Sequence, residues 1–237
     1  VVGDEAGTAI TTGDNNVAVG YQSLDANTTG SRLTAVGNEA LSANTTAAFN
    51  VAVGDRALLT NTGSSNNVAV GANALYTFNV GSGDGYNVAV GKNAGLSVTT
   101  GHTNTLIGGL AGDAITTGSG NTFIGFESGS YGTNLTTGTT NTLVGAYNNT
   151  TAVNSVNAMG LGYNLDCAGG YTTVGSGSAE IRAPHGSAAW ATASDQRYKK
   201  DIVDSTAGLS FINALQPRTF KYKTLGELPE TFRAYEA

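Results

Sequence analysis

The sequence of 237 residues is poor in the residues that mark several common protein classes. It has one cysteine, Cys167, so no intrachain disulfide can form. The two histidines, His102 and His185, stand far apart and lack cysteine or carboxylate neighbours in the sequence, which argues against a zinc site. No apolar run approaches the roughly 18 residues of a membrane span. We therefore expect no metal, no cofactor and no membrane insertion.

Charge is scarce, and glycine is abundant. Charged residues make up 12% of the chain, about half the usual share of ~25%. The 34 glycines disfavour a helical bundle. A hydrophobic content of 40% disfavours a disordered chain. The composition therefore predicts an all-β protein with frequent tight turns.

The charges and prolines divide the chain into two parts. Residues 1–180 contain three basic and eleven acidic side chains, a net charge of −8. Residues 181–237 contain eight basic and six acidic side chains, a net charge of +2, and all three prolines follow residue 183. This shift predicts a boundary near residue 180. The acidic first part argues against a nucleic-acid partner.

A short phrase, typified by Asn50-Val-Ala-Val-Gly54, recurs through the first part. Its closing glycines stand at positions 3, 20, 37, 54, 71, 91, 108, 125 and 145, with a less regular one at 162. The spacing is 17 residues, with two steps of 20 that must each carry three extra residues. We place the first insertion in the glycine-rich segment 79–85. Because the chain begins within this pattern, we expect it to be part of a longer protein.

A second glycine, usually preceded by two threonines, stands seven residues before most closing glycines. The period therefore predicts two short strands and two corners per coil of a solenoid. A coil of this length favours a flattened, two-sided roll, in which aligned Asn and Thr side chains bond along the stack.

The strand pattern also predicts how the two faces are used. Val17 and Val19 point to one face and Ala18 to the other, because side chains alternate along a strand. Such a thin roll has little core and exposes one face. Since small residues allow backbones to approach closely, we expect the alanine face to contact sister chains in a homotrimer. A monomeric solenoid with a solvated second face is the alternative.

The repeated phrase, followed three residues later by alanine or serine, carries a family resemblance over residues 1 to about 165. It resembles the parallel β-roll of trimeric autotransporter adhesin heads, and still more the related repeats of bacteriophage tail fibres. The resemblance implies a left-handed roll, three identical chains and a place outside the host cell, in the fibre of a virion. Residues 1–165 would form the shaft or receptor-binding region.

Residues 166–193 read as a transition or linker, after which the sequence becomes charged. The pattern Ser194, Asp195, Arg197, Lys199, Ile202 is followed by a short helical stretch ending at Pro217 and a strand-like segment, Phe220-Lys-Tyr-Lys223. It resembles the start of the intramolecular chaperone auto-processing domain at the end of phage tailspikes and fibres. We expect residues 194–237 to be the truncated, α+β start of such a domain.

That resemblance implies specific roles for three residues. Ser194 would be the nucleophile, Lys199 its base and Arg197 a support for the oxyanion, with the chain cut between Ala193 and Ser194. Such a reaction is at most a single-turnover autoproteolysis, and we expect no turnover enzyme. A depolymerase needs two acidic residues at one groove, whereas the acids of the roll are scattered along the coils.

Aromatic residues in and near the wider coils are candidates for contact with a sugar, and the alternative is that they only cap the surface of the roll. They are Tyr76, Phe78, Tyr86, Tyr131 and Tyr147. The sequence thus predicts a trimeric tail-fibre segment for host attachment, with two identical chains, other tail proteins and a cell-surface glycan or protein as its partners. A bacterial surface adhesin and a ligand-free structural spacer are the alternatives.

Overall fold

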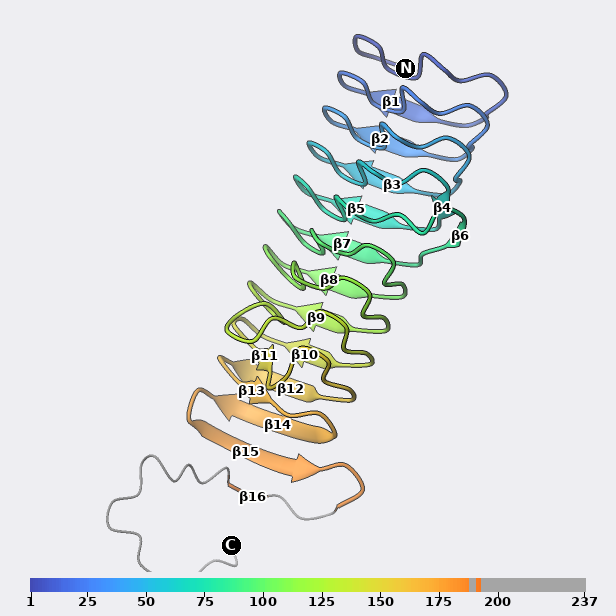
Figure 1. The fold of residues 1–237 in the computed structure, drawn as a ribbon. Helices are drawn as coiled ribbons and strands as arrows, with labels where there is room; N and C mark the ends of the chain where they lie inside the picture. Colours follow the sequence, from blue (N-terminus) through green and yellow to red (C-terminus); the bar gives the residue numbers. More distant parts are fainter. Residues whose placement is uncertain (188–190, 193–237) are drawn as a thin grey trace, which may run out of the picture. The chain divides into compact units, whose positions relative to one another are not determined.

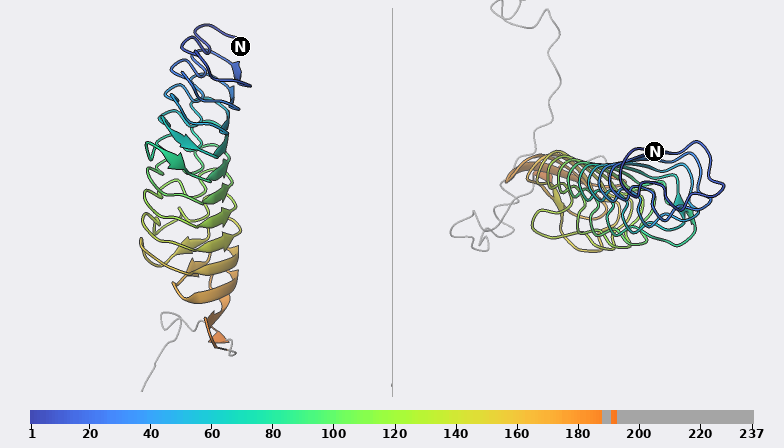
Figure 2. Two further views of the ribbon diagram at one scale, coloured as in Figure 1. Left: turned by 90° about the vertical axis from the view of Figure 1, so that its right-hand side faces the viewer. Right: turned by 90° about the horizontal axis from the view of Figure 1, so that it is seen from above.

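The computed structural model describes residues 1–187 and 191–192, which form a parallel β-solenoid (Figure 1). These described residues contain strands and turns but no helix. Figure 2 shows the coils stacked one upon the next. The main sheet begins with one strand per coil: β1 (Val17–Val19), β2 (Thr34–Val36), β3 (Val51–Val53), β5 (Val68–Val70), β7 (Val88–Val90), β8 (Thr105–Ile107), β9 (Thr122–Ile124) and β10 (Thr142–Val144).

The strand register confirms the predicted coil length. Val17 pairs with Thr34 across β1 and β2, an offset of one 17-residue coil. The offset becomes 20 between β5 and β7, and again between β9 and β10. In the first wide coil, Thr62 bonds to Asn79 at the normal offset, whereas Asn87 bonds to Asn67 at an offset of 20. The extra residues therefore lie between Asn79 and Asn87, where the glycine-rich segment was expected.

The two faces of the strands are the reverse of the predicted arrangement. Ala18 is fully buried, while Val17 and Val19 are 48% and 36% exposed. The same pattern holds in the coils of β2, β3 and β5. In each of these four coils the interior also contains a leucine that stands four residues after the closing glycine, such as the fully buried Leu24. A narrow interior has room for a leucine opposite an alanine but not opposite a valine. The alanine face is therefore core, and the valine face lies outside.

Each coil has one strand on the main sheet, and the second strand expected per coil is mostly replaced by turns. Elsewhere in the described residues, short strands pair at only two places. One pair is β4 (Ser64–Ser65) with β6 (Gly83–Asp84), and the other is β11 (Asn149–Thr150) with β13 (Asp166–Cys167).

Two kinds of glycine shape the coil for different reasons. The closing glycine has a positive φ, 137° at Gly54, and a Cβ there would lie 2.6 Å from the backbone of Gly71 in the next coil. The corner glycine needs no positive φ. At Gly30 a Cβ would lie 2.3 Å from the carbonyl oxygen of Ala47, so this glycine permits the close stacking of two coils.

Buried asparagines bond from coil to coil, as the repeat predicts. Asn104 donates its backbone N–H to Asn87 Oδ1 at 3.0 Å and its Nδ2 to Gly118 O at 3.0 Å. Asn121 repeats the first contact onto Asn104. This asparagine ladder, four residues before the closing glycine, comprises Asn50, Asn67, Asn87, Asn104, Asn121 and Asn141. Because every rung satisfies buried polar atoms, the ladder fixes the coil register without an apolar contact.

Within residues 166–193, which the sequence predicts as a transition or linker, β-strands continue the main sheet beyond the repeats. The sheet continues through β12 (Met159–Tyr163) to β14 (Tyr171–Ser176), which then turns into the antiparallel β15 (Ala179–Pro184), followed by β16 (Ala191–Thr192). The expected α+β domain start falls on residues 194–237, outside the described residues.

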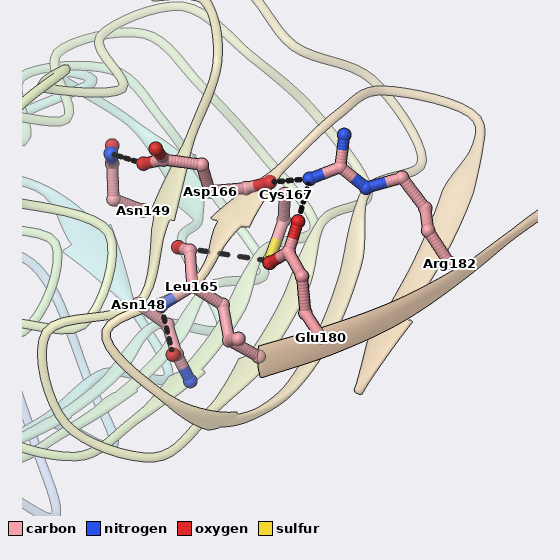
Figure 3. Close-up of polar contacts among 7 residues, drawn as sticks. All are labelled: Asn148, Asn149, Leu165, Asp166, Cys167, Glu180 and Arg182. Carbon is pink, nitrogen blue, oxygen red and sulfur yellow. Dashed lines mark hydrogen bonds and ion pairs between the residues drawn. The ribbon is translucent and has the colours of Figure 1, made fainter. Parts of the chain in front are cut away.

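Polar contacts hold this end of the solenoid together (Figure 3). Arg182 Nη2 donates to the carbonyl oxygen of Asp166 at 2.7 Å and also contacts Glu180. Cys167 lies beside them, fully buried, and burial followed by the charge of Glu180 raises the pKa of its thiol to about 12. The thiol is therefore protonated at neutral pH and serves as a small core residue.

Candidate functional surfaces

The outer side of the main sheet forms a long face without charged side chains, which we call the valine face. It carries two ladders of outward residues, one at each side of the buried strand centre. The first ladder is Val17, Thr34, Val51, Val68, Val88, Thr105, Thr122, Thr142 and Met159, and the second is Val19, Val36, Val53, Val70, Val90, Ile107, Ile124, Val144 and Leu161.

The valine face has the physical character of an association surface. Its members are half-buried to exposed, with Val17 at 48% and Leu161 at 54%. Contiguous apolar area of this kind on a soluble protein marks a place where another surface docks. Since neither ladder contains a charged residue, the surface that fits this face is also uncharged.

Four aromatic rings gather at one corner of the last wide coil and its neighbours, and we call them the aromatic cluster. Tyr147 is at its centre, with edge-to-face contacts to Phe126, Tyr131 and Tyr163 at centroid distances of 5.5, 5.0 and 5.6 Å. Phe126 and Tyr163 each directly follow a closing glycine, and Tyr147 stands two residues after one. The stacking of coils therefore brings together rings that are far apart in the sequence.

Tyr131 joins this cluster because the coil is wide at that point. Asp113 bonds to Ser130 at the normal offset of 17, whereas Thr116 bonds to Thr136 at an offset of 20. The three extra residues thus lie between Ser130 and Thr136, and they allow the ring of Tyr131 to contact that of Tyr147. A pocket of about 330 Å³ opens here, lined by Tyr131, Tyr147, Tyr163 and Asn164.

The structure separates the five aromatic residues that the sequence offered for sugar contact. Tyr131 and Tyr147 meet in the aromatic cluster. Tyr86 is exposed elsewhere, and its hydroxyl donates to Asp84 Oδ2 at 2.9 Å, a hydrogen bond that raises its pKa. Tyr76 makes no ring contact with the cluster.

Phe78 does not fit the expected role. It is fully buried in the core and takes the coil position held by asparagine in the preceding coils. A ring without exposed surface cannot stack on a ligand.

Sequence reasoning missed Phe126, Tyr163 and Asn164. The signal was available, because Phe126 and Tyr163 occupy the same coil position, one residue after a closing glycine, two coils apart. Only an alignment of successive coils makes that shared position visible, whereas reading the insertions alone points to loop residues.

The residues proposed for self-cleavage, Ser194, Arg197 and Lys199, lie outside the described residues. Their part of the chain has a known counterpart. Residues 194–234 match the family described as chaperone of endosialidase. We call these residues the chaperone segment. The match begins at Ser194, the residue at which the sequence resemblance placed the start of the domain.

Comparison of the chaperone segment and the solenoid with curated proteins and with solved structures gives no match. Within residues 1–187 and 191–192, no helix is long and apolar enough to cross a membrane. The same residues contain no group of three or more His, Cys, Asp or Glu side chains placed to hold a metal ion.

Proposed function

We propose that this chain is a segment of a homotrimeric bacteriophage tail fibre that attaches the virion to its host, with other tail proteins as further partners. The solenoid forms the shaft, and the chaperone segment assists the association of three chains. Two observations support this proposal together: a solenoid with an uncharged outer face, and the match of residues 194–234 to the chaperone of endosialidase.

The valine face is the surface through which we expect the three chains to meet. Its ladders run from β1 to β12 at the spacing of the coils, so a parallel copy of the same solenoid matches it at every coil. Burial of β-branched side chains between copies removes apolar area from water at roughly 25 cal/mol per Å². Parallel β-structure has many non-local contacts and folds slowly, which gives a chaperone segment its use.

The mass of the chain in solution tests the trimer. Wild-type chain should sediment as three copies, whereas Val53→Glu combined with Val70→Glu should dissociate it, because both side chains point outward and a buried unpaired carboxylate is costly. Thr29→Glu, at an exposed corner, is the matched control and should leave the trimer intact. A monomeric wild-type chain would contradict the proposal.

Self-cleavage is the second part of the proposal. The Ser194 hydroxyl, deprotonated by Lys199, attacks the carbonyl carbon of Ala193, and Arg197 stabilises the oxyanion that forms. The C–N bond between Ala193 and Ser194 then breaks, the lysine returns the proton to the freed amine, and Ala193 is left as an ester on Ser194. Water hydrolyses this ester, which separates the chain into one part that ends in the carboxylate of Ala193 and another that begins with Ser194. The family match supports it through the position at which the matched residues begin.

Expression of the whole gene followed by intact-mass measurement tests the cut. We expect the mature chain to end at Ala193, and Ser194→Ala to remain uncut. A wild-type chain that stays intact would make the segment a permanent trimerisation unit.

A further inference from the structure

We infer that the aromatic cluster is a binding site for an uncharged carbohydrate. The inference rests on the host-attachment part of the proposed function and names the chemical class of the receptor. It is carried by three features of the cluster: its unused polar groups, its lack of charge and the insertion that builds it.

The pocket presents the mixed chemistry that a sugar ring requires. Tyr131 and Tyr163 are 47% and 53% exposed. Their rings offer flat apolar surface to the C–H groups of a pyranose. In the described part of the chain, no hydrogen bond uses the hydroxyls of Tyr131, Tyr147 and Tyr163 or the carboxamide of Asn164. These four groups are therefore free to bond to sugar hydroxyls, in a space of about 330 Å³ that lies within the ~300–1,000 Å³ usual for small-ligand sites.

The lining predicts a neutral sugar over an acidic one. None of the four residues that line the pocket carries a charge. A sialylated or uronic-acid sugar brings a carboxylate, which proteins usually meet with arginine or lysine. An acidic sugar would lose water around that carboxylate without gaining a cationic partner from the pocket lining.

Structural packing explains only part of the cluster. Edge-to-face pairs contribute roughly 0.5–1.5 kcal/mol each beyond their buried area, which accounts for the central ring of Tyr147. Packing does not account for Tyr131. This residue lies in the stretch where the coil has three residues more than the usual 17, and it keeps about half of its surface in solvent. An insertion that projects an aromatic ring beside a pocket is typical of a binding loop.

An array of oligosaccharides tests the inference on the full chain. The probes are neutral oligosaccharides of hexoses and N-acetylhexosamines, with sialylated oligosaccharides as a second set. We expect wild-type chain to bind a member of the neutral set, and Tyr131→Ala and Tyr163→Ala to weaken it roughly tenfold or more. Tyr163→Phe, which removes only the hydroxyl, should weaken it roughly two- to tenfold.

Tyr21→Ala is the matched control. Tyr21 follows Gly20 as Tyr163 follows Gly162, and it is 46% exposed but makes no ring contact in the described residues. It should leave binding unchanged. Melting temperatures of all variants separate loss of the site from loss of the fold.

Three outcomes would overturn the site: no neutral oligosaccharide binds wild-type chain, only sialylated ones bind, or Tyr131→Ala and Tyr163→Ala bind as wild type does. A trimer that binds no neutral sugar overturns this inference alone. A monomeric wild-type chain overturns the proposed fibre instead.

Discussion

The early coils, those of β1 to β5, and two later coils, those of β8 and β9, share a backbone but fill their interiors in opposite ways. In the coils of β1 to β5 the strand centre is alanine, and the fourth residue after the closing glycine is a buried leucine, as in Ala52 and Leu58. In the coils of β8 and β9 the strand centre is large, Leu106 or Phe123, and the fourth residue is glycine. A Cβ on Gly112 would lie 2.8 Å from Leu106 Cδ2. The large side chain that fills the interior thus comes from the fourth position after the closing glycine in the early coils, and from the strand centre in the coils of β8 and β9.

A second position also changes along the solenoid, beginning in the coil of β5, which still has Ala69 and Leu75. Seven residues after the closing glycine, the early coils carry buried Asn27, Asn44 and Asn61, which bond to their own corners, as Asn27 does with Gly30. The coils of β5 to β9 place buried apolar residues at this corner, namely Phe78, Val98, Ile115 and Leu135, the last of which stands ten residues after Gly125 because of the three-residue insertion. The comparison teaches that the glycine spacing sets the backbone, while the interior can be filled by two different sets of side chains.

Converting a late coil into an early one is the strongest test of this comparison. Leu106→Ala alone should lower the free energy of unfolding by about 2–5 kcal/mol because it leaves a cavity. Gly112→Leu alone should cost about 1–3 kcal/mol through crowding against Leu106 and Ile115. The double variant should be more stable than the sum predicts, by about 1–3 kcal/mol. Urea unfolding followed by circular dichroism measures all three variants. If the two single changes in the free energy of unfolding simply added up in the double variant, the leucine at position 112 would not be filling the space left by Leu106.

Interrupting the asparagine ladder should have the next largest effect. Asn104→Leu leaves the N–H of Asn121 and the carbonyl of Gly118 buried without their partner. A loss of about 1–3 kcal/mol in the free energy of unfolding should follow. The control is Asn134→Leu at an exposed loop position, which should change little. If both variants lowered the free energy of unfolding equally, the hydrogen bonds of the ladder would contribute no stability of their own.

Extending the ladder should matter less. Leu33 occupies a ladder position in an early coil, and its backbone N–H already bonds to Asn16 Oδ1 at 3.0 Å. In Leu33→Asn the new amide can bond to Asn16 and Asn50, which offsets the lost burial of a leucine. We expect a change within about 1 kcal/mol, measured in the same urea titrations. A cost as large as that of Asn104→Leu would mean that early coils need leucine here.

The smallest expected effect concerns Asp25, in the corner of an early coil. Burial, and to a lesser extent the charges of Glu5 and Glu39, raise its pKa, and its Oδ1 has no partner in the described residues. Because the folded chain holds this proton more tightly than the unfolded chain, the contribution of Asp25 to stability is greatest in acid and is lost as pH rises through its folded-state pKa.

Asp25→Asn should therefore raise the melting temperature at pH 7 and lose that advantage in acid. Calorimetry at the two pH values checks this, with the exposed Asp14→Asn as control. A wild-type chain that is no less stable at pH 7 than the variant would contradict the sign.

The coil length, the closing glycines and the position of the first insertion could be predicted, because close backbone stacking admits few residues other than glycine. Which strand face is buried could not. Valine and alanine are both apolar, and alternation alone does not say which of them faces inward. The leucine four residues after the closing glycine in the coils of β1 to β5, as in Leu41, decides it, since its volume leaves room only for alanine opposite.

The candidate site was predicted in part for a similar reason. Tyr131 and Tyr147 were singled out by their place in or beside a wide coil, and the structure brings them together. Tyr163 was missed because its partnership depends on the stacking of separate coils. Phe78 was misplaced because the sequence alone does not reveal that its coil position points inward.

The residues with positive φ in each coil affect how the solenoid forms. Positive φ recurs at four positions of the coil, and residues such as Gln22, Leu24 and Arg32 occupy three of them in place of glycine. Each such residue costs roughly 1–2 kcal/mol, so a lone coil, with few buried side chains, is unstable until a neighbour is present. Formation should therefore begin with a slow nucleus and continue by rapid templated growth, coil upon coil. When the chain refolds, the circular dichroism signal of its β-strands should therefore appear only after a lag.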